Sequence, residues 1–274
     1  MQIVANNLVK MQRARGAGTL ATQLRDGGTH LHTLYQDGCA KIRLPHTHDQ
    51  SLEAVLINTA GGLTGGDYMR WQADIAPGSR ATITTQACER IYRSTGATAQ
   101  VETHLTVGAG AHLDWLPQET ILFAKSRFER WINIDLAPDA SLTAIEAVLL
   151  GRDAMGEDAR DALFRDNWRI RRNGRLVHAE ATHIDGSDMS RDNLALLAGT
   201  RAFATIIHFG TNLTSRLEQV RALLPEGAMA AASVSGERLV IRAMANSGLA
   251  LRRTIVPILG ALSRAGSLPR LWHL

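Results

Sequence analysis

Four glycines crowd the segment N-T-A-G-G-L-T-G-G-D, which spans residues 58–67 and ends in Asp67. They are Gly61, Gly62, Gly65 and Gly66. Such a cluster indicates a backbone conformation that other residues adopt only with strain. A phosphate-binding loop would need G-x-x-x-x-G-K-S/T, but lysine is absent and Asp67 carries the wrong charge. The segment also lacks G-x-G-x-x-G, so it predicts a tight loop whose backbone Asp67 hydrogen-bonds, not a nucleotide site.

Two pairs of histidines offer a different chemistry. The first pair is His30 and His32, and the second is His46 and His48. Each pair places two imidazoles on one face of an extended segment, where they suit zinc, copper or nickel. A structural metal site needs three or four ligands, so solvated loop histidines are the competing interpretation. The pairs support one alternative function, that of a metal-dependent all-β hydrolase.

Nucleophilic chemistry has little support in the sequence. No G-x-S-x-G is present, and Cys88, followed by Glu89, has no histidine beside it. The two cysteines, Cys39 and Cys88, lie far apart and outside any C-x-x-C, which argues against a disulfide framework or a zinc knuckle. We expect Cys88 to act as a small apolar residue. The residues alone therefore supply no catalytic set.

The composition of the 274-residue chain is that of an ordinary globular protein, with 45% hydrophobic and 20% charged residues. We expect a single domain over residues 1–274. The net charge is +4, but no basic stripe with interleaved aromatics occurs, so no nucleic-acid partner is expected. No apolar run reaches the roughly 18 residues of a membrane helix, and the N-terminus lacks a signal peptide's apolar core. These features predict a cytoplasmic protein without a membrane partner.

Alternating apolar and polar residues predict strands over the first two thirds of the chain. Segments 69–75, 97–107 and 132–136 follow this period of two. Turn residues such as Pro77-Gly78 separate the runs, and no helical pattern lies between them. The pattern predicts an antiparallel or coiled, mostly-β body and excludes a βαβ sheet.

A weak internal repeat refines this prediction. I-A-P-G-S-R-A-T-I (75–83), V-G-A-G-A-H-L-D-W (107–115) and L-A-P-D-A-S-L-T-A (136–144) each join a strand end, a tight turn and a new strand. They recur after 32 and then 29 residues. A repeat of this length indicates stacked β-layers, although a β-sandwich built from hairpins would give a similar pattern.

The last third of the chain predicts two helices and one strand. Ser215 and Glu218 have the spacing of a capping box, and an apolar stripe follows them up to Pro225. A second helix is expected over residues 247–264, with Pro257 kinking or breaking it. Between the helices, residues 236–244 are expected to form a strand.

Several segments together resemble the UreD (also called UreH) family of urease accessory proteins. The glycine segment 58–67 is similar to the family's signature, and T-T-Q-A-C-E-R-I-Y-R-S (84–94) is similar to a second block. The most recognisable block is L-D-W-L-P-Q-E-T-I-L-F (113–123), followed by A-I-E-A-V-L-L-G-R-D-A-M-G-E (144–157). Residues 168–180 and the terminal P-R-L-W fit as well. The chain departs from the family pattern at Ala124-Lys125-Ser126 and matches loosely after residue 180.

The resemblance implies a β-helix-like stack of strand layers with two α-helices in the C-terminal third. It also implies a maturation factor and not an enzyme. Such a factor binds apo-urease, a scaffold accessory protein and a nickel-carrying accessory GTPase, and assists nickel insertion into the urease active site. A polar passage for the metal is part of the expectation. Nickel would bind transiently, with no cofactor held tightly.

The resemblance also assigns roles to particular residues. The candidate nickel path comprises Asp67, Glu119, Glu146 and Glu180. The signature and partner residues comprise Gly61, Gly62, Gly65, Gly66, Thr84, Thr85, Tyr92, Arg93 and Ser94. For each of these a purely structural role stays open, since a carboxylate such as Glu119 can equally hydrogen-bond the backbone.

Overall fold

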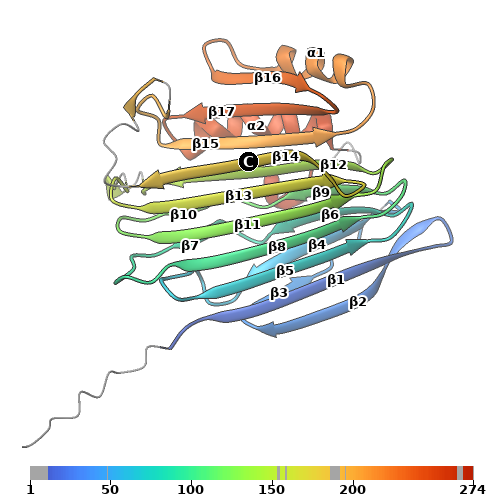
Figure 1. Ribbon diagram of the computed structural model, residues 1–274, viewed down its shortest axis with the longest axis horizontal. Helices are drawn as coiled ribbons and strands as arrows, with labels where there is room; N and C mark the ends of the chain where they lie inside the picture. Colours follow the sequence, from blue (N-terminus) through green and yellow to red (C-terminus); the bar gives the residue numbers. More distant parts are fainter. Residues whose placement is uncertain are drawn as a thin grey trace, which may run out of the picture.

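The computed structural model describes residues 12–47, 49–152, 155–157, 159–185, 192–194, 196–263 and 268–273. Strands make up most of these ranges, and the two α-helices both lie in the last third of the chain (Figure 1). The predicted fold class, mostly β with a stack of strand layers, is confirmed.

The strands follow one another with short connections. Their bounds are β1 (Arg15–Arg25), β2 (Gly28–Gly38), β3 (Ala40–Arg43), β4 (Leu52–Asn58), β5 (Tyr68–Ile75), β6 (Arg80–Thr85), β7 (Glu89–Ile91), β8 (Ala99–Val107), β9 (His112–Leu116), β10 (Thr120–Leu122), β11 (Arg127–Leu136), β12 (Ser141–Leu150), β13 (Leu163–Arg172), β14 (Arg175–Asp185), β15 (Ala202–Phe209), β16 (Met229–Ser235) and β17 (Arg238–Ala245). The helices are α1 (Leu213–Leu223), α2 (Gly248–Leu262) and the short 3-10 helix η3 (Arg270–Trp272).

Two large sheets face each other. The first has the order β14-β13-β11-β8-β5-β1-β2, and the second the order β16-β17-β15-β12-β9-β6-β4-β3. In the middle of each sheet the neighbours are parallel, as in β5, β8 and β11. The chain therefore winds from one sheet to the other and back, adding one coil at a time, and the strands climb through the stack in chain order (Figure 1).

The internal repeat marks the corners of these coils. Ile75, Val107 and Leu136 are aligned across three parallel strands of the first sheet. Where the chain restarts in the second sheet, Arg80, His112 and Ser141 are aligned in the same way. Each repeat thus lies directly on the previous one. The stacked interpretation is confirmed, and the alternative of a sandwich of hairpins is wrong because these strands are parallel.

Apolar side chains fill the space between the sheets. In β8 the alternate residues Val101, Thr103 and Leu105 are buried, as the period of two predicts. Val101 and Leu105 form one continuous core with inward residues of the facing sheet, such as Leu113 and Leu142. Burial of this apolar area is the main stabilising contribution to the stack.

A second core lies between the outer face of the second sheet and the helices. It includes Ile145 and Ala147 of β12, which point away from the inter-sheet core, together with Ile255 and Leu259 of α2. Near the chain's end, Trp272 is fully buried and donates its indole N–H to the carbonyl of Leu116, at 2.9 Å.

The start of α1 differs from the sequence prediction. The helix begins at Leu213, and its N-cap is Asn212 in the left-handed region with φ of 56°. No side chain caps it, and Ser215 already lies inside the helix, so the predicted capping box of Ser215 and Glu218 is wrong. Asparagine tolerates a positive φ better than most residues, which lets the chain enter the helix without a serine cap.

The second helix and the strand before it match their predictions closely. Strand β17 covers most of the predicted segment 236–244, and α2 begins after Ser247, whose hydroxyl accepts a hydrogen bond from the Ala250 amide at 3.2 Å. The predicted end at residue 264 lies outside the described residues. Pro257 does not break α2. Pro257 and Arg253, the residue one turn earlier, are both exposed, so water can solvate the carbonyl that proline leaves without a donor.

Candidate functional site: a buried polar line between the sheets

The glycine segment forms a tight loop between β4 and β5. A side chain at Gly62 would overlap the ring of Tyr92, and one at Gly65 would overlap the hydroxyl of Ser94 and the carbonyl of Ala97. Gly62 also has φ of 144°, which L-residues rarely adopt. The glycines are therefore explained by close approach to the segment at Tyr92 and Ser94.

Asp67 holds this loop together. Its two carboxylate oxygens accept hydrogen bonds from the backbone amides of Ala14, at 2.9 Å, and Thr64, at 2.7 Å. The residue is 5% exposed. The structure thus bears out the hydrogen-bonding role predicted from the sequence, and both oxygens are engaged by backbone amides at the loop.

Most residues of the second signature block hydrogen-bond the backbone of neighbouring segments. Thr85 accepts from the Gln118 amide at 2.8 Å, whereas Thr84 is buried. Tyr92 donates to the carbonyl of Gly61 at 3.2 Å, and Ser94 donates to that of Ala97 at 2.5 Å. The Tyr92 bond fastens the glycine loop to the segment that follows β7. Arg93 instead is exposed.

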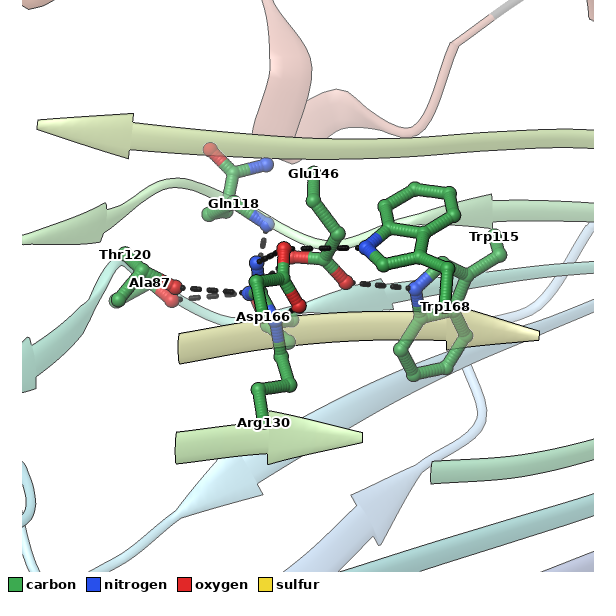
Figure 2. A network of polar contacts seen from close by, with 9 residues as sticks. Ala87, Trp115, Gln118, Thr120, Arg130, Glu146, Asp166 and Trp168 are labelled. Carbon is green, nitrogen blue, oxygen red and sulfur yellow. Dashed lines mark hydrogen bonds and ion pairs between the residues drawn. The ribbon is translucent and has the colours of Figure 1, made fainter. Parts of the chain in front are cut away.

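A charged network lies buried between the sheets, near the C-terminal end of the stack. Arg130 of β11 binds Asp166 of β13 through two parallel hydrogen bonds, of 2.9 and 2.7 Å, and also donates to Glu146 of β12 (Figure 2). Trp115 and Trp168 donate their indole N–H groups to Glu146 and Asp166, both at 3.0 Å. One guanidinium therefore binds two carboxylates, one from each sheet.

Two buried carboxylates facing one arginine leave an excess negative charge. Burial raises the pKa of Glu146 to about 7, even though Arg130 lowers it, and the charge of Asp166 adds to the increase. The same two carboxylates raise the pKa of Arg130, which stays protonated. A pKa of about 7 lets Glu146 exchange a proton near neutral pH.

Glu119 lies next to this network, directly before β10. It accepts hydrogen bonds from Arg252 of α2, at 2.6 and 3.1 Å, and from the Cys88 thiol, at 3.3 Å. Burial and the charge of Glu119 raise the pKa of Cys88 to about 12, so the thiol is protonated and unreactive. The next residue, Thr120, accepts a hydrogen bond from Arg130 at 3.2 Å.

Glu180 of β14 has its partners on β15 and β17. It accepts hydrogen bonds from Thr205 of β15, at 3.1 Å, and from Arg242 of β17, at 3.0 Å. Burial alone would raise its pKa, but His178 and Arg242 lower it below the usual value. Thr205 pairs directly with Glu146 across the sheet, so their side chains lie on the same face.

These contacts connect into one feature, which we call the polar line. Hydrogen bonds join Thr120, Arg130, Asp166 and Glu146, and Thr205, which lies beside Glu146 on the same face of the sheet, leads on to Glu180. Glu119 precedes Thr120 in the chain, but its side chain binds Arg252 and Cys88 instead. The polar line ends at a cavity of about 690 Å³ beside Glu180, lined mainly by apolar residues of β14 to β17. Of the four acids named from the resemblance, Glu146 and Glu180 belong to the polar line, whereas Glu119 is bound by Arg252 of α2. Asp67 is held separately, in the glycine loop.

Sequence reasoning missed Arg130, Asp166 and Arg252, although a signal for the first two is present. Asp166 stands between Phe164 and Trp168 in an alternating strand, at a position that should face inward. Arg130 occupies the equivalent position in β11. An ionisable residue at an inward position indicates a buried partner. Arg252 carries no such signal, because α2 reaches Glu119 only in the folded chain.

The described histidines of the two pairs, His30, His32 and His46, do not form a metal centre with other described residues. His30 and His32 lie on β2, largely in contact with solvent, and His46 lies on the segment after β3, whereas His48 lies outside the described residues. Within the described ranges, no three His, Cys, Asp or Glu side chains come together as a metal site. Among the same residues, no helix is long and apolar enough to span a membrane.

The sequence of nearly the whole chain also shows to which protein family it belongs. The family described as "UreD urease accessory protein" matches residues 14–273, and the chain belongs to this family. Urease accessory protein UreD of Chelativorans sp. (strain BNC1) is 58% identical over 264 residues, covering 96% of this chain and 95% of the relative. That of Rhizobium rhizogenes (strain K84) is 50% identical over 273 residues, covering 99% of both. The protein is accordingly a urease accessory protein and not an enzyme, and the hydrolase alternative is wrong.

Proposed function

We propose that the protein assists nickel insertion into urease by binding apo-urease together with the scaffold accessory protein and the nickel-carrying GTPase. A role in urease maturation follows from the family, and the relatives carry the name urease accessory protein. The named partners, transient nickel binding and a cytoplasmic location belong to the proposal.

The observation that carries the proposal is that Glu146 and Glu180 lie on the polar line, with Glu119 beside its Thr120 end in the chain. Ni²⁺ is a borderline cation that carboxylates hold without the tight grip of thiolates. A buried acid whose partner is an arginine already occupies a site that accepts positive charge. A divalent cation moving past such an acid would compensate part of the negative charge that the guanidinium otherwise compensates. Nickel is the cargo of this path and not a resident cofactor.

Glu146 is the acid to test, because it lies in the middle of the line and its pKa is raised to about 7. Glu146→Gln keeps the shape of the side chain and can still accept the Trp115 hydrogen bond. We expect the variant to form the complex with apo-urease but to lower urease activation and nickel content at least fivefold. Glu218→Gln, on the solvent side of α1, is the matched control.

Two readouts separate the parts of the proposal. Co-purification with apo-urease and the scaffold protein tests partner binding, and nickel per urease active site tests metal delivery. A wild-type chain that ignores both proteins would contradict partner binding. Full activation by the correctly folded Glu146→Gln variant would contradict the nickel role of the polar line.

A further inference from the structure

A second pocket lies on the outside of the stack, where the segments after β7, β10 and β12 meet. Its volume is about 500 Å³. Its lining residues are Tyr92, Arg93, Phe123, Ala124, Lys125, Arg152 and Glu157. They come from three separate parts of the chain that the parallel ladder of β7, β10 and β12 brings together. We call it the aromatic–basic pocket.

The base of the pocket is built from stacked side chains. Tyr92 packs edge-on against Phe123, with ring centroids 5.0 Å apart, and the guanidinium of Arg152 lies 4.5 Å from the centre of the Phe123 ring. Glu157 fixes this arrangement, since it accepts from Arg152 at 2.5 Å and from the Ala124 amide at 2.9 Å. The aromatic base is therefore in place before any partner binds.

Two cations at the rim of the pocket, Lys125 and Arg93, take no part in the stacking at its base. Lys125 has a positive φ of 59°, and the Asp161 carboxylate holds its backbone amide at 2.8 Å. The side chains of Lys125 and Arg93 make no ion pair or hydrogen bond with the part of the chain that the structure describes. The nearby carboxylates of Glu157 and Asp161 are engaged by the loop itself. Among the side chains that the structure describes here, the rim therefore has an excess of positive charge, since Arg93, Lys125 and Arg152 outnumber Glu157 and Asp161.

We infer that the aromatic–basic pocket is the docking site for an acidic segment of a protein partner. Aspartate or glutamate side chains of that segment bind Arg93 and Lys125, and an apolar side chain beside them packs on Tyr92 and Phe123. Aromatic and arginine groups around a pocket are the features that dominate the binding energy of protein interfaces. This inference rests on the proposed function, because it gives the maturation partners a site on the surface.

Charge complementarity favours an acidic protein segment over a nucleic acid. The excess positive charge lies at the rim of one pocket, and the whole chain has a net charge of only +4. A nucleic-acid groove would instead continue as a basic stripe that follows the phosphate backbone. A short acidic segment needs only the two rim cations and the aromatic base.

The test compares two charge-reversed variants in binding assays with purified apo-urease, scaffold protein and GTPase. Arg93→Glu/Lys125→Glu changes the pocket, and Arg43→Glu/Arg70→Glu changes two exposed cations on β3 and β5. Each variant replaces two positive charges by two negative ones, which takes the net charge from +4 to zero. We expect the pocket variant to weaken the Kd for a partner at least tenfold and the control variant less than twofold.

The outcomes distinguish this inference from the proposed function. If the wild-type chain binds none of the three proteins, the proposed function fails. If it binds and both variants bind equally well, only the docking site is wrong. Should the pocket variant fail to fold, Arg93→Gln/Lys125→Gln removes the charge without reversing it, and at least a threefold loss is expected.

Competition identifies the chemical class of the occupant. A poly-glutamate peptide should displace the partner from the wild-type chain, and this displacement should weaken as salt increases. A single-stranded oligonucleotide should compete less well than the peptide. Stronger competition by the oligonucleotide would overturn the assignment to an acidic protein segment.

Discussion

Asp67 in the glycine loop and Glu146 between the sheets are both 5% exposed, but they are neutralised differently. Asp67 accepts two backbone amides, which form part of the fold and cannot move away. Glu146 shares the Arg130 side chain with Asp166 and also accepts from Trp115. A carboxylate held by amides builds a loop, whereas one balanced by a side-chain cation can exchange its partner. The two regions thus differ in whether the partner of the buried carboxylate is fixed backbone or a side-chain cation.

Removing the shared cation should give the largest effect. Arg130→Met leaves Glu146 and Asp166 buried without their counter-charge, and breaking a buried ion pair in this way costs roughly 3–5 kcal/mol. Urea denaturation should measure this loss of unfolding free energy. Arg127→Met is the control, since Arg127 is exposed on the same strand. A loss below about 1 kcal/mol for Arg130→Met would contradict the view that Glu146 and Asp166 need this buried counter-charge.

The glycine loop should respond to steric changes instead. Gly62→Ala meets the Tyr92 ring and the carbonyl of Arg90, at a φ that alanine rarely adopts, so we expect a loss of about 2–3 kcal/mol. Gly61→Ala also has a positive φ, of 76°, but nothing lies within 4 Å of the new methyl group. It should cost only about 1 kcal/mol. Equal losses in thermal or urea denaturation would show that backbone strain alone matters in this loop.

Asp67→Asn tests whether the loop carboxylate is structural. An amide offers one acceptor oxygen, so either the Ala14 or the Thr64 amide loses its partner, at a cost of about 1–2 kcal/mol. Urease activation by the folded variant should stay at the wild-type level, in contrast to Glu146→Gln. Lost activation with unchanged stability would return Asp67 to the nickel path.

The effect of replacing Glu89 should depend on pH. Its carboxylate accepts hydrogen bonds from the Asn58 side-chain amide, at 3.0 and 3.2 Å. Burial raises its pKa from 4.5 to about 7, although the hydrogen bonds with Asn58 and the Arg90 backbone lower it. Since the folded state then binds the proton more tightly than the unfolded state, stability falls as pH rises from about 4.5 to 7. Glu89→Gln removes this dependence.

The Glu89→Gln variant should therefore gain on the wild type as pH increases. Between about pH 5 and 7.5 we expect the unfolding free energy of the variant to rise by about 1–2 kcal/mol relative to the wild type. The rise stays this small because solvent reaches part of the Glu89 side chain and screens its charge. Urea denaturation at several pH values measures it. A difference between the two chains that does not change with pH would mean that Glu89 titrates normally in the folded state.

The coil architecture was predictable because its signals are local. The alternation within each strand, and the repeated turns that begin at residues 75, 107 and 136, can each be recognised within a short stretch of sequence. The direction of strand pairing was not predictable, since parallel and antiparallel neighbours share the same period of two. The cap of α1 was missed because Asn212 adopts a left-handed conformation that no short pattern predicts.

The candidate site was predictable only in part. The resemblance placed Glu119, Glu146 and Glu180, but not their basic partners. Arg130 lies 16 residues from Glu146 and 36 from Asp166 in the chain, so only the stacking of coils brings them together. Arg252 is 133 residues from Glu119. Charge pairing over such separations is a property of the folded chain and leaves no local pattern.

The order of the coils has a consequence for how the chain is made. Each parallel coil rests on the one synthesised just before it, and the antiparallel strands β2 and β3 close the first end of the stack at the outset. A growing chain on the ribosome therefore presents one unfinished end of the stack at a time. Because exposed strand edges promote aggregation, this sequence of addition limits the risk during translation.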